Sequence, residues 1–263
     1  MTAVQTPPPP LPVRGRSATR ALSPMLTRLA EEQATGVLVR EHGTLYLAEG
    51  CVVHAESPLA PGLDVLLTAH GTLATTAWQW AAARTPGPLQ AAELLLECGL
   101  LPAGALELCH LDALYDAGYF ALAPSSAPGR FRYDRAPRIG PLPSVPVVAL
   151  ERETLRRRML LHRLWPDPAA DSAPLIRADP AATAPVTSRQ RAVLDRVDGV
   201  RTATAIARNL GRQAFHTLVD VRRLAAAGHL GPVTAPPPPP PLPPVTDPDI
   251  ALLKRLRDAL EAL

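Results

Sequence analysis

The segment from Thr187 to Leu230 constrains the fold more than any other part of the chain, because its turn signals divide it into three short helices. Asp198-Gly199 separates the first helix from the second, and Gly211 lies where the next connection needs a positive φ. Gly228 ends the third helix. Between these breaks the apolar residues follow helical spacing, so the segment predicts a compact unit of three helices.

The second and third of these helices have the spacing of a helix-turn-helix, and the segment is similar to the winged-helix domains of bacterial transcription regulators. The resemblance implies that the third helix enters the major groove of DNA. Arginine suits guanine and phosphate, and glutamine suits adenine. The residues expected to contact DNA are Arg201, Arg208, Arg212, Gln213, His216 and Arg223.

Two features of the same segment weaken the prediction of DNA binding. Asp220 is expected on the outer face of the third helix, where it would repel phosphate. Gly231-Pro232 leads quickly into a proline run and leaves little chain for a wing. Because small winged-helix folds also serve as protein-docking modules, DNA binding and protein docking remain two alternatives.

The first half of the chain predicts a small antiparallel sheet with helices. Residues 35–56 alternate apolar and polar side chains between glycine-containing turns, which is typical of a three-stranded meander. The pair Trp78 and Trp80 indicates a strand-like piece. Helices are expected over 23–33, 62–70, 88–98, 102–122 and 147–164, and an edge strand over 129–134. The expected fold class is α+β, a small antiparallel sheet with helices followed by a mostly helical winged-helix-like domain.

Three short motifs in this first half resemble the PATAN-type domain of bacterial regulatory proteins. They are the runs Thr35-Gly36-Val37-Leu38 and Gly50-Cys51-Val52-Val53-His54-Ala55, and the glycine Gly62 that opens a helix. The resemblance covers residues 20–135. It implies protein–protein interaction rather than catalysis, in signalling systems that contain small GTPases, roadblock proteins or response-regulator receivers.

Charge is distributed unevenly along the chain, although the net charge is only +3. Residues 31–129 hold two arginines against eleven acids, whereas residues 130–163 hold nine arginines against three acids and residues 187–235 hold eight against three. Such asymmetry is expected either where the basic part meets a polyanion or an acidic protein, or where the two parts neutralise each other within the fold.

No other motif predicts chemistry. Cys98, Cys109 and His110 lack metal-ligand spacing, and the surrounding leucines favour buried structural thiols. No nucleophile motif or phosphate-binding glycine loop occurs, so no catalytic, cofactor-binding or metal-binding residue is expected. The run Arg156-Arg157-Arg158 is expected either on a solvated helix face or in contact with phosphates or an acidic partner.

The expected organisation has six parts. They are a disordered Pro/Arg-rich tail (1–20), a PATAN-like interaction domain (21–135), a basic helix and linker (136–186), a winged-helix-like domain (187–234), a polyproline linker (235–246) and a C-terminal amphipathic helix (247–263). With no apolar run long enough to span a bilayer and no signal-peptide pattern, we expect a cytoplasmic protein.

The function expected from these features is that of a non-enzymatic bacterial regulator, most simply a transcriptional regulator that binds DNA through the helix-turn-helix. The alternative is an adaptor in a signalling complex, whose winged-helix-like domain contacts a partner protein and not DNA. The sequence leaves the oligomeric state open.

Overall fold

The computed structural model describes residues 22–69, 71–133, 142–178, 184–233 and 248–262. It divides into two compact units, Met1–Val233 and Thr234–Leu263, each of which is described by itself. The predicted N-terminal tail (1–20) and polyproline linker (235–246) lie outside the described residues.

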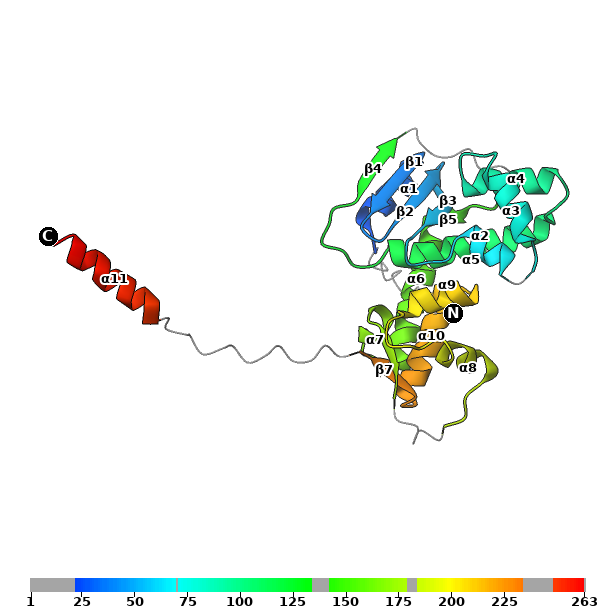
Figure 1. Ribbon diagram of the computed structural model, residues 1–263. Helices are drawn as coiled ribbons and strands as arrows, with labels where there is room; N and C mark the ends of the chain where they lie inside the picture. Colours follow the sequence, from blue (N-terminus) through cyan, green and yellow to red (C-terminus); the bar gives the residue numbers. More distant parts are fainter. Residues whose placement is uncertain (1–21, 70, 134–141, 179–183, 234–247, 263) are drawn as a thin grey trace, which may run out of the picture. The chain divides into compact units, whose positions relative to one another are not determined.

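The first unit has an α+β fold built on a five-stranded antiparallel sheet (Figure 1), as the sequence predicts. The strand order is β4-β1-β2-β3-β5. The strands are β1 (Gly36–Arg40), β2 (Gly43–Ala48), β3 (Cys51–Glu56), β4 (Arg130–Tyr133) and β5 (Val145–Pro146). The meander predicted over 35–56 is therefore confirmed, and β4 is an edge strand.

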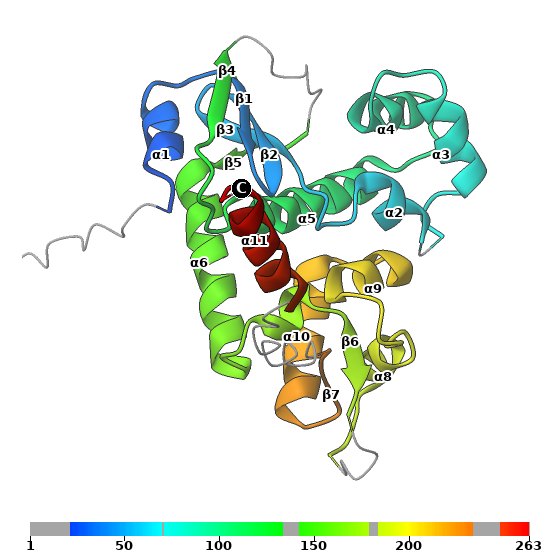
Figure 2. The ribbon, with the colours of Figure 1, turned by 60° about the vertical axis from the view of Figure 1, so that its left-hand side comes forward.

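One face of the sheet carries the core because apolar side chains recur at every second position. Leu38 lies opposite Leu45, and Leu45 lies opposite Ala55, and all three are buried. Helix α5 packs along β2 and β3 (Figure 2). The helices of this half are α1 (Pro24–Glu31), α2 (Leu63–Thr68), α3 (Thr75–Ala82), α4 (Pro88–Glu97) and α5 (Ala103–Ala121).

The strand-like piece predicted around Trp78 and Trp80 is wrong, because both residues lie in α3. Trp78 is buried and Trp80 is exposed, as expected on a helix, where residues i and i+2 point to nearly opposite sides, whereas on a strand both would lie on one face. Trp78 packs in a separate apolar cluster with leucines of α2, α4 and α5.

Helix α6 (Val147–Leu164) has the predicted bounds, but the linker predicted to follow it contains a short helix and a strand. Residues Ala169–Ser172 form α7, and Leu175–Arg177 form strand β6. Strand β6 pairs antiparallel with β7 (Leu230–Pro232), which follows the three-helix segment. The composition of this stretch concealed a strand whose partner lies more than fifty residues later in the sequence.

The three predicted helices are α8 (Ser188–Leu194), α9 (Ala203–Leu210) and α10 (Ala214–Ala226). Thr187 caps α8, and Thr202 caps α9. The backbone N–H of Leu175 donates to the carbonyl of Arg201, so the α8–α9 connection also lies along β6. Together β6, β7 and the three helices form the winged-helix-like unit of the following sections.

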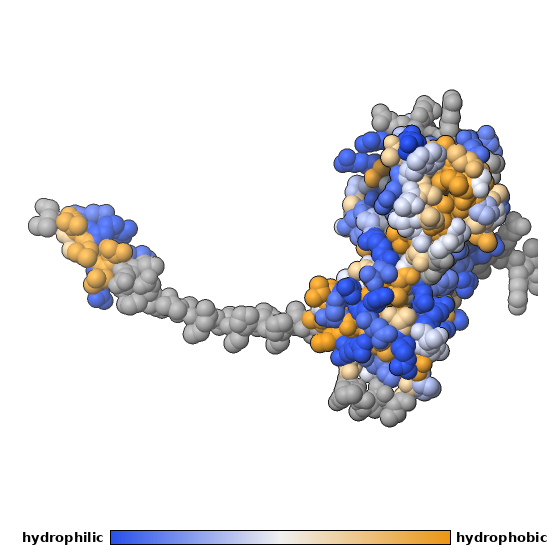
Figure 3. Space-filling view, turned by 45° about the vertical axis from the view of Figure 1, so that its right-hand side comes forward, coloured by the Kyte–Doolittle hydropathy of each residue, from blue (hydrophilic) through white to orange (hydrophobic). Residues whose placement is uncertain are grey.

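The winged-helix-like unit packs directly against the sheet-containing half. Helix α10 contacts α5 and α6 as well as α7, α8 and α9. In the view of Figure 3 a hydrophobic patch lies on the upper part of the first unit, and the lower part carries many hydrophilic residues with hydrophobic ones at its left edge. The helix predicted at the C-terminus is present as α11 (Pro248–Leu260) in the second unit. Among the described helices, none is both long and apolar enough to cross a membrane.

Candidate functional site

The six residues predicted to contact DNA do not come together on one projecting face. Arg212, Gln213 and His216 line a cleft of about 300 Å³, together with Arg189 of α8 and Asp112 of α5. Arg212 is half-buried, and its Nη1 makes no hydrogen bond with any described residue. Three of the six thus face a concavity that α5 helps to form.

The other three lie outside this cleft. Arg201 lies in the α8–α9 connection, where its Nε is 3.5 Å from Oδ2 of Asp198. Arg208 is exposed at the end of α9, and its Nη2 donates to the carbonyl oxygen of Pro58. Arg223 is exposed on the second half of α10. The structure therefore assigns these arginines to separate neighbourhoods.

Asp220 does not lie on the outer face where the sequence placed it. Its side chain is 5% exposed, and Oδ2 accepts hydrogen bonds from Nε and Nη2 of Arg189 at 3.0 and 2.9 Å. This ion pair joins α8 to α10, which explains an acidic residue in an otherwise basic segment.

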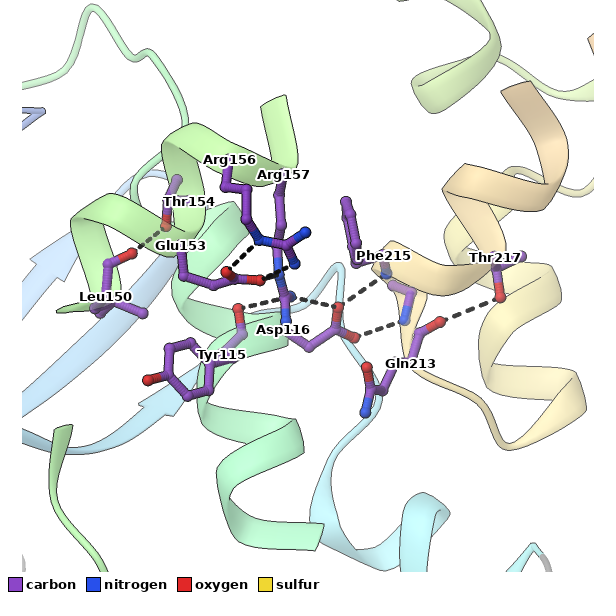
Figure 4. Close-up of polar contacts among 11 residues, drawn as sticks. Tyr115, Asp116, Leu150, Glu153, Thr154, Arg156, Arg157, Gln213, Phe215 and Thr217 are labelled. Atoms are coloured by element: carbon purple, nitrogen blue, oxygen red, sulfur yellow. Dashed lines mark hydrogen bonds and ion pairs between the residues drawn. The ribbon is translucent and has the colours of Figure 1, made fainter. Parts of the chain in front are cut away.

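The first turn of α10 is capped by a residue of the sheet-containing half. Asp116 of α5 is fully buried, and its two carboxylate oxygens accept the backbone N–H groups of Ala214 and Phe215 at 2.6 and 2.9 Å (Figure 4). These are the first two N–H groups of α10, which have no partner within their own helix. The carboxylate thus occupies the N-terminus of α10, which is the end that a recognition helix places in a DNA groove.

Arg157 of α6 completes this contact. Its Nη1 lies 3.8 Å from Oδ1 of Asp116 and donates to the carbonyl of Tyr115, and its Nε donates to Glu153. The guanidinium also lies over the ring of Phe215, 4.5 Å from the centroid. Three helices therefore share one buried polar network.

The charge of Asp116 depends on this environment. Burial raises the pKa of Asp116 to about 6, while the two backbone N–H donors and the positive charge of Arg157 act to lower it. Burial and the nearby Arg189 and Arg157 likewise hold the pKa of His216 below its usual value.

The α9–α10 turn makes a second close contact with the first half. Gly211 adopts φ of +62°, and a Cβ built on it would lie 1.9 Å from the Cβ of Ala69, which follows α2. Glycine is needed here both for its backbone conformation and for its lack of a side chain. The predicted positive φ is confirmed, and the packing against α2 adds a constraint that the sequence did not indicate.

A polar cluster on the sheet was not singled out by the sequence. Tyr46 donates to Glu56 at 2.9 Å, and Nε2 of His54 lies 3.4 Å from the same carboxylate. The ring of His110 stacks on His54, with centroids 5.7 Å apart, and its Nε2 is 2.9 Å from the carbonyl of Val53. Burial lowers the pKa of His110 to about 4, so its ring is neutral near pH 7 and Nε2 donates.

The cysteines differ from the predicted buried pair. Cys98 is exposed and Cys109 is half-buried, and both are free thiols, as is Cys51. Cys98 follows the last turn of α4, beyond the leucines that face the core. Among the described residues, no group of three or more His, Cys, Asp and Glu side chains is arranged to hold a metal ion.

Sequence reasoning missed Asp116, although a signal for it was present. Asp116 is a carboxylate within the predominantly apolar stretch 113–122, and an acid in such a position is rarely buried without a specific partner. The arginine run was noticed, but its three members have three different environments. Arg156 is exposed and paired with Glu153, Arg157 is buried, and Arg158 is half-buried.

Comparisons with protein-family models, curated proteins and solved structures found no match to this chain. The resemblance to the PATAN-type domain therefore stays a prediction based on its short motifs, and the function has to be argued from the geometry described above.

Proposed function

We propose that the protein is a non-enzymatic regulatory adaptor of the cytoplasm, in which the winged-helix-like unit is a structural part rather than a DNA reader. The observation that carries this proposal is the capping of α10 by Asp116. A recognition helix contacts bases with its N-terminal residues, so that end has to be free. Here it is bonded to α5, and the adjacent Arg212 and Gln213 line a cleft with Asp112.

An adaptor also needs surfaces for its partners, and α11 offers one. Its leucines Leu252, Leu253, Leu256 and Leu260 are each more than half exposed. An isolated helix of thirteen residues is marginal in water, so burial of these leucines against another protein would stabilise it. The partner class is a signalling protein of the small GTPase, roadblock or response-regulator type, as the PATAN resemblance implies.

A DNA-binding regulator is the second candidate, favoured by the exposure of Arg208, His216 and Arg223. These groups are accessible to phosphate. Binding of that kind would weaken steeply with added salt because it releases counterions from the DNA.

A gel-shift experiment separates the two candidates. Full-length protein is titrated into duplex DNA at roughly 50 and 200 mM salt, the range over which phosphate contacts weaken strongly. The adaptor predicts no complex at either concentration. A complex that is lost in Arg208→Ala/Arg223→Ala, but kept in the control Arg191→Ala on exposed Arg191 of α8, would overturn the adaptor in favour of the regulator.

The docking role of α11 is tested by affinity capture with matched variants. Leu252→Ser/Leu256→Ser removes two exposed leucines, while Lys254→Ser/Arg255→Ser introduces the same residue type at two exposed charged positions of the same helix. We expect a signalling protein to be retained by the unchanged chain and by the charge variant, and lost by the leucine variant. Equal capture by all three proteins would exclude α11 as the docking surface.

A further inference from the structure

A cavity of about 350 Å³ lies where the winged-helix-like unit meets the sheet-containing half. Its walls come from the loop after β3, the end of α5, and helices α6, α7, α9 and α10. Leu59, Phe120 and Leu218 make much of the lining apolar. It is distinct from the cleft lined by Arg212 and from the Asp116 network.

Arg158 of α6 lines this cavity and has no ion-pair partner within the described part of the chain. The one hydrogen bond of its guanidinium runs from Nη2 to the carbonyl of Leu122, at the end of α5. Burial and the nearby positive charge of Arg40 lower the pKa of Arg158, but a guanidinium stays protonated at neutral pH. Four of its five donor hydrogens are therefore without a protein acceptor among the described residues.

The acid at this cavity, Asp171 of α7, does not neutralise Arg158. Its two oxygens accept from Nε and Nη2 of Arg222 at 2.7 and 2.6 Å. Arg222 is buried in α10, and this bidentate pair satisfies both groups. Arg158 therefore keeps its positive charge at the cavity, and Arg40 adds a second positive charge nearby.

Hydroxyl groups add donors near that charge. Tyr119, Ser172 and Thr204 all line the cavity. The pKa of Tyr119 is raised by burial and by the charge of Asp171, while Arg158 acts to lower it, so the phenol lies within the field of both charged groups and stays protonated. A protonated phenol can donate to an anion held by Arg158.

We propose that this cavity binds a small monocarboxylate with a compact apolar body. The unpaired guanidinium recognises the carboxylate, the hydroxyls supply further hydrogen bonds, and the apolar walls cover the remainder of the ligand. Inorganic phosphate fits less well, because it has no apolar part to contact Leu59, Phe120 and Leu218. If each non-hydrogen atom takes about the 30 Å³ that a water molecule occupies in the liquid, a ligand of about ten non-hydrogen atoms fills the cavity.

A ligand in the cavity would bridge the sheet-containing half and the winged-helix-like unit, because it would touch α5 and α6 on one side and α9 and α10 on the other. The protein would then respond to a metabolite as well as to a protein partner. This inference does not depend on the adaptor function, since it rests on a different set of residues.

The test is isothermal titration of the full chain with benzoate, phenylacetate and hexanoate. At least one carboxylate is expected to bind with a dissociation constant on the order of 1 mM, a usual value for a ligand of this size. The matching amide and inorganic phosphate are expected to bind at least about tenfold more weakly, because the amide loses the charge-assisted bonds and phosphate leaves the apolar walls uncovered. Failure of all three carboxylates to bind, or equal binding of the amide, overturns the proposal.

Two variants on α6 then locate the site. Arg158→Gln is expected to weaken carboxylate binding about tenfold or more. Arg156→Gln, two positions earlier and exposed, is the control and should leave binding unchanged. Tyr119→Phe keeps the packing of the ring and should weaken binding several-fold, which preserves the test if the arginine variant does not fold. Unchanged affinity in both Arg158→Gln and Tyr119→Phe would exclude this cavity as the site.

Discussion

Arg157 and Arg158 are consecutive residues of α6, yet they lie in two regions of opposite character. Around Arg157 every charged group has a partner: Glu153, Asp116, the Tyr115 carbonyl and the Phe215 ring surround one guanidinium. Around Arg158 there is a cavity, and the guanidinium bonds one carbonyl. We call the first region the closed side of the junction and the second the open side.

The difference distinguishes a charge that holds the fold together, at Arg157, from a charge that remains free to bind a ligand, at Arg158. A buried network in which all donors and acceptors are satisfied fixes the position of the elements that it joins. A half-buried guanidinium that lacks a counterion is energetically unfavourable, so an anionic ligand that pairs with it lowers the free energy. The closed side therefore determines how the winged-helix-like unit is attached, whereas the open side is where a small molecule can act.

The largest effect is expected when Asp116, the buried acid of the closed side, is removed. Asp116→Ala leaves two buried N–H groups of α10 without an acceptor and removes one of the two acids that face Arg157, so we expect a loss of about 4 kcal/mol in the free energy of unfolding. Urea denaturation of the full chain measures it. Asp116→Asn keeps an acceptor oxygen and should lose roughly half as much. A loss below about 1 kcal/mol for the alanine variant would mean that the junction is not held by this carboxylate.

The two arginines can be compared directly with the same substitution. Arg157→Met breaks the buried network and should lower the free energy of unfolding by about 3 kcal/mol. Arg158→Met removes a half-buried charge that has no ion pair, and should change it by less than about 0.5 kcal/mol. Both values come from denaturant titrations under one condition. Equal losses would abolish the distinction between the two sides.

Glycine substitutions test the attachment of the α9–α10 turn. Gly211 and Gly228 both have positive φ, but a Cβ on Gly228 meets nothing within 4 Å. Gly228→Ala should therefore cost about 1 kcal/mol for the backbone alone. Gly211→Ala should cost about 2 kcal/mol more, since the new methyl group collides with Ala69. If thermal unfolding shows the same loss for both, the turn does not pack against α2 in solution.

The stability of the closed side is also expected to depend on pH. The pKa of Asp116 is about 6 in the folded protein and about 3.8 when unfolded, so the folded state binds this proton more tightly between those values. Relative to Asp116→Asn, the unchanged protein should gain about 1 kcal/mol in stability as the pH falls from 7 to 5. Denaturation curves at the two pH values measure this gain. A loss over the same interval would show that Asp116 ionises more readily in the folded state than when unfolded.

Local sequence patterns predicted most of the secondary structure. The alternation over 35–56 specified the meander, and α6 has the bounds expected for the helix over 147–164. Gly211 marked the end of α9 correctly because the positive φ of a glycine is a local property of the backbone. Trp78 and Trp80 were misassigned, since two residues are too few to separate a helical period from a strand period.

The candidate sites could not be predicted in the same way. Strand β6 was taken for linker because its pairing with β7 is a long-range contact that leaves no local signal. The arginine run was visible, but nothing adjacent to it shows that one member faces Asp116 and the next a cavity. His216 was expected to project toward DNA and instead lines a cleft with α5.

The sequence by itself determined the bounds of most helices and of the three-stranded meander, and that the fold combines a small antiparallel sheet with a three-helix segment. Only the tertiary structure decided what that segment is attached to. The N–H groups at the start of α10 need an acceptor in any fold, and the packing of α10 on α5 supplies it from Asp116, 98 residues away in the chain. A choice of that kind depends on how elements pack in space, which short-range periodicity does not record.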